Sequence, residues 1–271
     1  MPIDVSAPVI ENRSLSRDYN VVVLAAPAIA AAASPGQFVM VKPTAGCDPL
    51  LRRPFSVFEV LRDADRGAPT ALSILSKRIG ASTRLLYDAR PGDRIAVLGP
   101  LGRPFTVVDP PIDAWMIAGG VGLAPFATLA EALRSRGVAT TLFYGARTGA
   151  ELFHLEFFRS LGVELALATE DGSIGEHGRI VGPLDRRLAA RSADAPLMLY
   201  ACGPEGMLAA TARVAKAHHR PCQVSVERVM GCGMGGCYSC VVPMRADHGG
   251  FHHVRSCLAG PVLAADQVLW D

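Results

Sequence analysis

The sequence has little net charge and no long apolar run. Among its 271 residues the formal net charge is only +2, which gives no basis for a surface that binds nucleic acid or an anionic membrane. The longest apolar run, residues 21–33, contains Pro27 and is too short to cross a bilayer. We therefore expect no nucleic acid among the partners of this chain and no insertion into a membrane.

Cysteine is scarce and a secretion signal is lacking. Residues 1–20 carry mixed charges without the apolar centre of a signal peptide. Seven cysteines are too few for a disulfide scaffold in a chain of this length. These observations predict a cytoplasmic protein whose cysteines work in a reducing compartment.

Four of the seven cysteines gather near the end of the chain. Cys232, Cys237 and Cys240 follow a C-x4-C-x2-C spacing in a glycine-rich stretch, and Cys257 follows after sixteen intervening residues. Three thiolates on one tight loop need backbone turns that glycine adopts without strain. The spacing is that of plant-type ferredoxins, so we predict that these four cysteines bind a [2Fe–2S] cluster.

Other uses of these thiols stay open at this point. Structural zinc usually takes two separated C-x2-C pairs, whereas here the fourth thiol stands alone. Disulfides would need an oxidising compartment, and a Rieske centre would need histidine in place of two cysteines. The remaining Cys47, Cys202 and Cys222 are expected to be small, buried and unreactive.

Residues 1–108 carry the pattern of an antiparallel β-barrel or sandwich. Apolar and β-branched segments predict strands at 21–24, 38–41, 56–60, 71–75 and 94–98, with one short helix at 81–88. Two motifs here suit a phosphate-bearing cofactor. In Arg53-Pro54-Phe55-Ser56 a guanidinium and a hydroxyl can bind phosphate, and Ser82-Thr83 opens the helix, whose N-terminus attracts anions. Each motif alone could equally be a solvated arginine or an ordinary helix cap.

Residues 109–222 change to alternating strands and helices, which predicts a parallel sheet with ligands at the carboxyl ends of its strands. Strands are expected at 115–118, 140–144, 164–168 and 197–200, and helices at 126–136, 152–161 and 208–218. Glycine-rich loops follow the first and last of these strands, at 119–123 and 202–207. Either loop could be a simple tight turn, but the two together favour a nucleotide site.

The order of these motifs resembles that of the ferredoxin-NADP reductase superfamily. With the four C-terminal cysteines, the chain is similar over essentially its whole length to the electron-transfer subunits of dihydroorotate dehydrogenase B. The resemblance implies a multi-domain protein with three parts. They are an antiparallel β-barrel that binds FAD at 1–108, an α/β parallel-sheet NAD-binding domain at 109–222, and a small [2Fe–2S] module at 223–271.

The resemblance also implies which residues contact each cofactor. For FAD they are Arg53, Pro54, Phe55, Ser56, Leu75, Ser76, Lys77, Ser82 and Thr83. Ser76, Lys77 and Ser82 depart from the family, which often has an aromatic residue, an arginine and a glycine there. For NAD(H) they are Gly119, Gly120, Val121, Gly122, Cys202, Gly203, Pro204 and Met207, with residues 145–147 and 169–173 on the ribose side. The cluster ligands are again Cys232, Cys237, Cys240 and Cys257.

The implied activity is that of an oxidoreductase subunit. NADH gives up two electrons together and a [2Fe–2S] cluster accepts one at a time, so FAD belongs between them. Hydride transfer to a flavin needs no separate acid or base, and no catalytic residue is assigned. The implied partner is an FMN-containing dihydroorotate dehydrogenase catalytic subunit of pyrimidine biosynthesis, in a heterotetramer. Met230, Met234 and Tyr238 would then face it, although such residues are equally suited to packing in a core.

Two other functions remain possible from the sequence. A related NAD(P)H:ferredoxin or sulfide-type oxidoreductase subunit would keep the cofactors and change the partner. A zinc-stapled nucleotide-binding regulator would not be an enzyme at all. The choice between NADH and NADPH also stays open, because Arg147 and Arg179 could bind a 2′-phosphate or be solvated.

Overall fold

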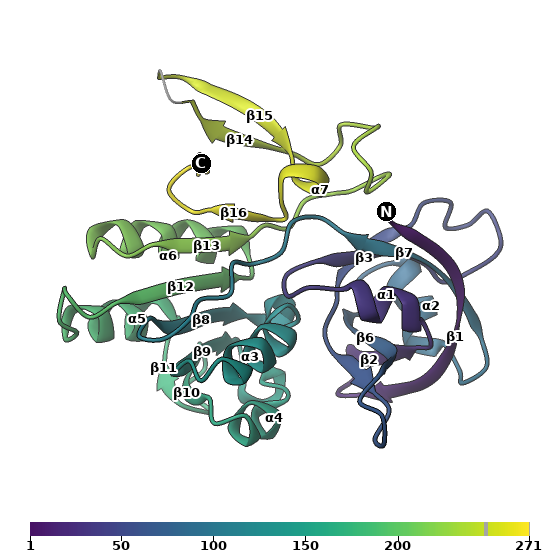
Figure 1. Ribbon diagram of the computed structural model, residues 1–271, viewed down its shortest axis with the longest axis horizontal. Coiled ribbons are helices and arrows are strands. Elements are labelled where there is room, and N and C mark those ends of the chain that lie inside the picture. The colour runs from purple at the N-terminus through teal and green to yellow at the C-terminus, as the bar shows by residue number, and fades with distance from the viewer. Residues whose placement is uncertain (247–248, 271) are drawn as a thin grey trace.

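The computed structural model describes residues 1–246 and 249–270, which form two seven-stranded sheets and a two-stranded hairpin (Figure 1). The first sheet is an antiparallel, strongly curled barrel with strand order β4-β3-β7-β1-β2-β6-β5, as predicted. Its interior is filled by buried aliphatic side chains such as Val22, Val39 and Ile74. Its elements are β1 (Ile3–Ser14), β2 (Tyr19–Leu24), α1 (Pro27–Ala32), β3 (Phe38–Lys42), β4 (Arg53–Ser56), β5 (Val60–Arg62), β6 (Pro69–Lys77), α2 (Ala81–Asp88) and β7 (Arg94–Leu101).

The segment predicted as one strand at 56–60 is a corner that closes the barrel. β4 pairs with β3, whereas β5 pairs with β6 at the opposite edge of the sheet. Between them the backbone N–H of Val57 donates to the carbonyl of Gln37 at 3.0 Å, and that of Phe58 to the carbonyl of Ser73 at 2.9 Å. The prediction of an unbroken strand was wrong because the corner divides its hydrogen bonds between two partners, which local sequence cannot indicate.

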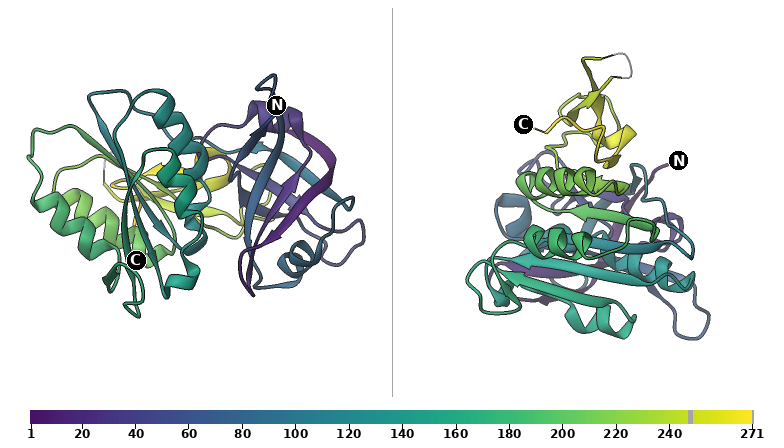
Figure 2. Two further views of the ribbon diagram at one scale, coloured as in Figure 1. Left: turned by 90° about the horizontal axis from the view of Figure 1, so that it is seen from below. Right: turned by 90° about the vertical axis from the view of Figure 1, so that its left-hand side faces the viewer.

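The second sheet has the order β11-β10-β9-β8-β12-β13-β16 and is parallel except for β16 (Figures 1 and 2). The order of strands reverses between the neighbours β8 and β12, which makes their carboxyl ends a topological switch point. The strands are β8 (Asp113–Gly119), β9 (Thr140–Ala146), β10 (Glu164–Thr169), β11 (Glu176–His177), β12 (Leu197–Cys202), β13 (Cys222–Ser225) and β16 (Val262–Ala264). The helices are η1 (Gly120–Leu123), α3 (Phe126–Ser135), η2 (Gly149–Glu151), α4 (Leu155–Ser160), α5 (Val181–Ala189) and α6 (Glu205–Ala217).

The helix predicted at 152–161 is shorter than expected. His154 adopts a left-handed backbone conformation with φ of 57°, so the helix begins only at Leu155. Leu152 and Phe153 precede it as buried, non-helical residues. Phe153 instead contacts Tyr19 of the barrel with ring centroids 4.8 Å apart. The prediction failed because a contact between the two sheets, rather than helical periodicity, places these residues.

The C-terminal segment is tied to both sheets. It comprises the hairpin of β14 (Val241–Arg245) and β15 (Phe251–Arg255) and the short helix α7 (Ser256–Ala259), and it begins and ends in the parallel sheet with β13 and β16. Met230, Cys240 and Cys257 pack against Met40 and Leu98 of the barrel. The domain boundaries at 108/109 and 222/223 stay predictions.

An apolar interface joins the barrel to the parallel sheet, which lie side by side in Figure 2. Phe105 of the connecting segment stacks on Phe126 at 5.9 Å and lies edge-on to Tyr200 at 5.4 Å. The Tyr200 hydroxyl donates to the carbonyl of Thr106 at 2.7 Å. These contacts fix the two sheets against each other. Within residues 1–246 and 249–270, no helix has the length and apolar character needed to cross a membrane.

Candidate cofactor and cluster site

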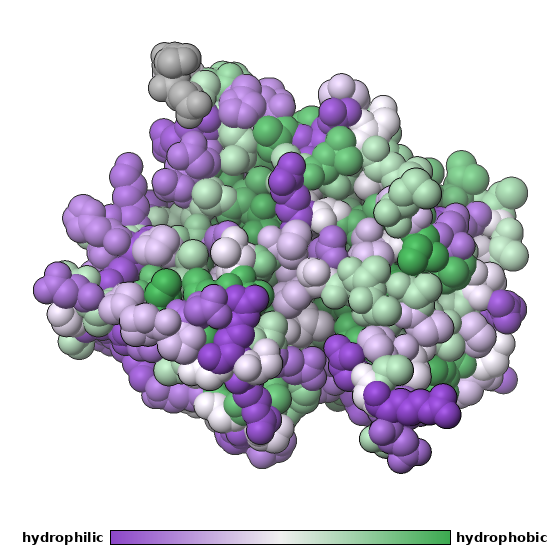
Figure 3. Space-filling model, viewed as in Figure 1, coloured by the Kyte–Doolittle hydropathy of each residue, from purple (hydrophilic) through white to green (hydrophobic). Residues whose placement is uncertain are grey.

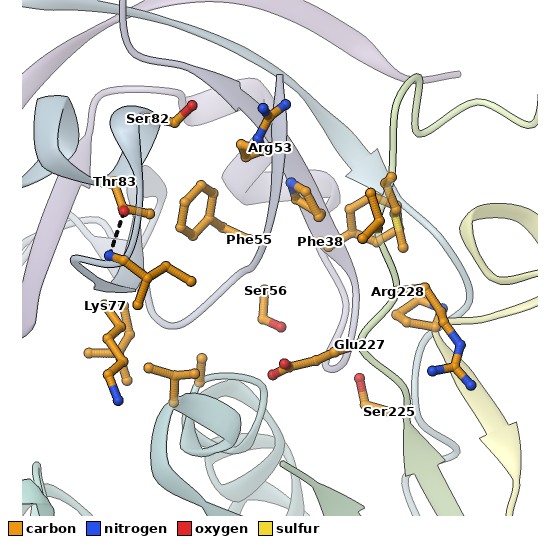
Figure 4. A pocket seen from close by; sticks show the side chains of 18 of the residues that line it. Phe38, Arg53, Phe55, Ser56, Lys77, Ser82, Thr83, Ser225, Glu227 and Arg228 are labelled. Atoms are coloured by element: carbon orange, nitrogen blue, oxygen red, sulfur yellow. Dashed lines mark hydrogen bonds between the residues drawn. The ribbon is translucent and has the colours of Figure 1, made fainter. Parts of the chain in front are cut away.

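A cavity of about 650 Å³ lies where the barrel, the carboxyl edge of the parallel sheet and the start of the C-terminal segment meet (Figure 4). Ten of the residues predicted to bind cofactors line it: Arg53, Pro54, Phe55, Ser56, Leu75, Lys77, Ser82, Thr83, Val121 and Cys202. Figure 4 shows Arg53, Ser82 and Thr83 on one side of the cavity and Ser225, Glu227 and Arg228 across from them. Two motif sets far apart in the sequence therefore face a common space.

The barrel side of the cavity has the features of an anion site. The Thr83 hydroxyl accepts hydrogen bonds from the backbone N–H groups of Ile79 and Gly80, both at 2.9 Å, and thereby orders the start of α2. The Ser82 hydroxyl is buried and has no hydrogen-bond partner in the described structure. A buried unpaired hydroxyl is costly unless a ligand satisfies it. Together with the helix N-terminus and Arg53, it fits the pyrophosphate of FAD.

Ser76 does not line the cavity, although it lies between Leu75 and Lys77, which do. Successive side chains of a strand point to opposite faces of the sheet, so Ser76 turns away from its two neighbours. It is 1% exposed, and its hydroxyl has no partner in the described part of the chain. Strand alternation therefore leaves Ser76 behind the cavity wall rather than on its surface.

The predicted nucleotide loops, 119–122 and 202–207, pack directly against each other at the switch point. A Cβ atom on Gly122 would lie 2.2 Å from the carbonyl oxygen of Cys202, and one on Gly119 would lie 2.7 Å from the sulfur of Met207. A Cβ atom on Gly203, whose φ is 155°, would lie 3.0 Å from the backbone nitrogen of Gly119. Of the predicted nucleotide residues, Gly119, Gly120, Gly122, Gly203, Pro204 and Met207 lie outside the cavity lining.

Gly120 faces open space, unlike Gly119, Gly122 and Gly203. Its φ of 55° is left-handed, and nothing lies within 4 Å of the position that a Cβ atom would take. The loop is followed by the turn η1 and the helix α3. An open backbone at this place fits the close approach of a dinucleotide pyrophosphate.

Sequence patterns missed the part of the cavity that follows β13. Ser225, Glu227 and Arg228 line it, and Arg228 makes a two-bond ion pair with Glu205 at 2.9 and 2.8 Å. The Glu227 side chain opens onto the cavity, but the surrounding protein displaces enough water to raise its pKa. The signal that could have located these residues is the short strand at 222–225, whose carboxyl end continues the ligand-binding edge.

The four C-terminal thiols lie near one another. The thiol of Cys237 interacts with that of Cys232, and the thiol of Cys257 interacts with those of Cys240 and Cys232. The Ser239 hydroxyl, 3.1 Å from the Cys237 sulfur, is the main group that lowers the pKa of Cys237 to about 6, with further contributions from the Ser239 backbone and Cys232. Burial and the neighbouring Cys240 raise the pKa of Cys257 to about 12.

The donor set bears on which metal these thiols fit. All four candidate ligands are cysteine thiols, and a [2Fe–2S] cluster takes two thiolates on each of its two irons. The donor set therefore fits a two-iron cluster.

Left-handed turns and close packing hold the cluster loop, residues 230–240. Gly233 has a φ of 72° and Gly235 a φ of 85°, and a Cβ atom on Gly235 would lie 2.5 Å from Leu258. Arg255 donates to the carbonyl of Gly235 at 2.6 Å, and its guanidinium lies 4.5 Å from the centre of the Tyr238 ring. The glycines are needed here because the backbone conformation strains other residues.

The cavity and the cluster thiols share a wall. Phe38 and Met230 line the cavity and also pack with Cys240 and Cys257. Met230 is 5% exposed, so the expectation that it faces a partner was wrong; Met234 and Tyr238 are exposed as expected. A single layer of side chains thus separates the two places where redox groups would bind.

Of the other three cysteines, Cys47 was predicted wrongly. It is exposed in the loop after β3, where turn geometry rather than packing places it. Cys202 is buried, which raises the pKa of its thiol. Cys222 is partly buried, and desolvation raises its pKa to about 12. Both behave as unreactive thiols at neutral pH.

Comparison with known proteins agrees with this arrangement. Residues 227–269 match the iron–sulfur cluster binding domain of dihydroorotate dehydrogenase B, and residues 116–213 match the oxidoreductase NAD-binding domain. Among proteins of solved structure, an NADH-dependent reduced ferredoxin-NADP oxidoreductase studied for flavin-based electron bifurcation is similar to this chain. The TM-score is 0.84 at 25% identity, covering 98% of this chain and 91% of the other.

Curated relatives cover nearly the whole chain. A dihydroorotate dehydrogenase B (NAD(+)) electron transfer subunit from Desulforamulus reducens is 37% identical over 91% of this chain and 90% of its own length. The corresponding subunit from Geobacillus kaustophilus is 40% identical, covering 87% of this chain and 86% of its own length. The chain therefore belongs to the family of electron transfer subunits of dihydroorotate dehydrogenase B.

Proposed function

We propose that this chain passes electrons between NAD(H) and the FMN-containing catalytic subunit of a dihydroorotate dehydrogenase, in the cytoplasm and as part of pyrimidine biosynthesis. The observation that carries the proposal is the shared wall of Phe38 and Met230 between the cavity and the cluster thiols. When bound, FAD and a [2Fe–2S] cluster supply the conversion of an electron pair into single electrons.

Arg53, Ser82 and the N-terminus of α2 bind the FAD pyrophosphate in this proposal. Phe55 and Leu75 offer an apolar wall for the flavin, and the Ser56 hydroxyl is available to it within the same cavity. Pro54 sets the backbone between Arg53 and Phe55. These residues bind and orient the cofactor and exclude water from it.

The two glycine-rich loops, 119–122 and 202–207, hold NAD(H). The backbone at Gly120 leaves room for the pyrophosphate, while Val121 and Cys202 reach the cavity where the nicotinamide must meet the flavin. This placement matches the general rule that ligands bind at the switch point of an open α/β sheet.

Cys232, Cys237, Cys240 and Cys257 would hold the two irons of the cluster, with two thiolates on each iron. The backbone N–H of Met234 donates to the Cys232 sulfur at 3.4 Å, which stabilises negative charge on it. Free thiols at these positions are consistent with a reducing compartment.

The catalytic subunit docks at the cluster loop. The side chains of Val229, Met234, Tyr238 and Leu258 are exposed there by 82, 57, 63 and 46%. In Figure 3, apolar residues gather at the upper right of the molecule, over the loop after β3 and the segment before β14. Exposed apolar and aromatic side chains around a redox centre suit a protein interface. We infer that the two kinds of subunit assemble as a heterotetramer.

Co-purification with the catalytic subunit tests the proposal. Alone, the chain should contain FAD and two irons and should reduce a one-electron dye with NADH, without oxidising dihydroorotate. Together, the two subunits should couple dihydroorotate oxidation to NAD+ reduction. Dihydroorotate oxidation by the isolated chain would contradict the subunit role. Electron transfer to ferredoxin in place of the catalytic subunit would favour the second partner class, and a colourless zinc protein would rule out both.

A further inference from the structure

The carboxyl ends of β9 and β10 lie beside the glycine loop that follows β8. Gly119 pairs with Gly145, and Ala146 pairs with Thr169, so Arg147 and Glu170 emerge at the same edge of the sheet as Gly120. Cys202 at the end of β12 and the loop after β13 line the cavity instead. A dinucleotide with its nicotinamide in the cavity and its pyrophosphate at Gly120 therefore extends its adenosine half over β9 and β10.

Arg147 is held at this edge by Glu151. Its Nε lies 3.2 Å from Oε2 of Glu151, and its Nη2 donates to Oε1 of the same carboxylate. The Tyr144 hydroxyl lies 3.1 Å from the carbonyl oxygen of Glu151 and 3.3 Å from that of Gly120. This contact fixes η2, and with it Glu151, beside the glycine loop.

The burial of the pair shows which member is fixed. The Glu151 side chain is 17% exposed and that of Arg147 is 68% exposed. The bond to Arg147 is the main cause of the lowered pKa of Glu151, and the charge of Lys77 lowers it further. Glu151 is thus a charged, anchored carboxylate, and Arg147 is the exposed side chain that it positions.

The other charges near Arg147 are mostly negative. Glu170 adds to the raised pKa of Arg147, after the larger effect of Glu151. Asp171 follows Glu170 and accepts hydrogen bonds from the backbone and hydroxyl of Ser173. Arg179 is exposed after β11, one strand further along the edge, and no ion pair joins it to another described residue. Close to the adenosine path, one paired arginine therefore faces three carboxylates.

We propose that Glu151 makes the nucleotide site selective for NADH over NADPH by withholding Arg147 from a 2′-phosphate. The inference rests on the proposed function, because it takes the dinucleotide to lie across the glycine loop. NADPH sites neutralise the 2′-phosphate with arginine, and a guanidinium does so best with both of its donor edges free. Here one edge is occupied, and the phosphate would also meet the carboxylates of Glu170 and Asp171.

Steady-state oxidation of NADH and NADPH by the full chain, loaded with FAD and its cluster and using ferricyanide as acceptor, tests this role. Glu151→Gln keeps the shape of the side chain and removes its charge, and Glu151→Ala serves as a second variant. We expect the ratio of kcat/KM for NADPH to that for NADH to rise about two- to fivefold, the equivalent of one exposed ion pair. The change should lie in KM for NADPH and leave kcat with NADH unaltered.

Two further variants show whether Arg147 is responsible. Adding Arg147→Ala to Glu151→Gln should cancel the gain, whereas Arg179→Ala should not. Glu156→Gln removes a comparable ion pair with Arg159 on α4 and should leave the ratio unchanged. An unchanged ratio in both Glu151 variants, with normal NADH oxidation, would overturn the inference alone. Absence of NADH oxidation in the unaltered chain would instead overturn the proposed function.

Discussion

Arg52 and Arg53 are consecutive in the chain, yet only one of them reaches the cavity. Arg52 donates from a single nitrogen to both carboxylate oxygens of Asp4, each at 2.9 Å, and so joins the loop before β4 to β1. Arg53 lines the cavity, and among the described residues its guanidinium donates only to the carbonyls of Leu51 and Arg52, which precede it in the chain. The two arginines thus form a matched pair for testing the flavin site.

Arg53→Ala should weaken FAD binding about 10- to 100-fold, because a charge-assisted hydrogen bond to phosphate contributes about 1.5–3 kcal/mol. Fluorescence titration of the flavin-free protein with FAD measures the effect. Arg52→Ala should leave FAD affinity unchanged and lower the free energy of unfolding by at most about 1 kcal/mol, since it removes a surface ion pair. Equal loss of FAD in both variants would place the phosphate elsewhere.

Cys237→Ser and Cys240→Ser should each abolish the visible absorbance of the cluster and reduce bound iron to background. Each serine removes one of the four thiolates that the cluster needs. Iron analysis and the visible spectrum of the anaerobically purified protein check the result. NADH oxidation with ferricyanide should persist, because it needs only the flavin.

Cys47→Ser is the control for the cluster variants, because Cys47 is exposed in a loop of the barrel. It should retain full iron content and an unchanged spectrum. Full iron in Cys237→Ser, or zinc in place of iron in the unaltered protein, would contradict the assignment of these cysteines to a [2Fe–2S] cluster.

Local sequence was sufficient to propose roles for the parts of the site that lie on one short motif. The spacing of Cys232, Cys237 and Cys240 indicates a cluster, and the glycine loop after β8 indicates a nucleotide, because each chemistry restricts the residue types; both roles stay predictions. The family resemblance extended these local motifs to a whole barrel and sheet. Both sheets and their order in the chain were foreseen in this way.

The rest of the site depends on contacts between distant segments. Glu227 enters the cavity because β13 pairs with β12. Met230 is buried because it packs against side chains of β3 and β7. Ser76 leaves the cavity because strand alternation directs its neighbours there. None of these placements follows from periodicity in one segment, since each depends on which strands pair and which segment packs against them.

Gly122→Ala should lower the free energy of unfolding by about 2–4 kcal/mol and abolish NADH oxidation. The new Cβ atom would lie 2.2 Å from the Cys202 carbonyl, so the two nucleotide loops would have to move apart. Chemical denaturation and dye-coupled NADH oxidation measure the two effects. Gly206→Ala is the control: it lies in α6 with open space around it and should be neutral or stabilising by up to about 1 kcal/mol. Similar losses in both variants would mean that the loops do not require close contact at Gly122.

His154 should make the protein less stable in mild acid. Its ring lies edge-on to Phe58 at 4.7 Å in the interface between the two sheets, and its Nε2 is buried without a partner among the described residues. Burial is the main cause of its lowered pKa, with the charge of Glu59 opposing the shift and that of Arg13 adding to it. Below the ordinary histidine pKa of about 6.5 the unfolded chain therefore binds a proton that the folded chain resists. The stability that neutral His154 contributes is therefore complete above pH ~6.5. It decreases as the pH falls from there towards the lowered pKa of the folded state.

The comparison of His154→Gln with the unaltered protein isolates this effect. Denaturant unfolding at pH 7.5 and pH 5 should show a smaller acid-induced loss of stability in His154→Gln, because glutamine does not titrate. His252→Gln, an exposed position on β15, should retain the full loss. If His154→Gln loses as much stability in acid as the unaltered chain, another group causes the acid-induced loss. That group could not be Glu131, whose carboxyl pKa is raised by burial and by Glu59. Protonation of such a carboxyl in acid stabilises the folded protein.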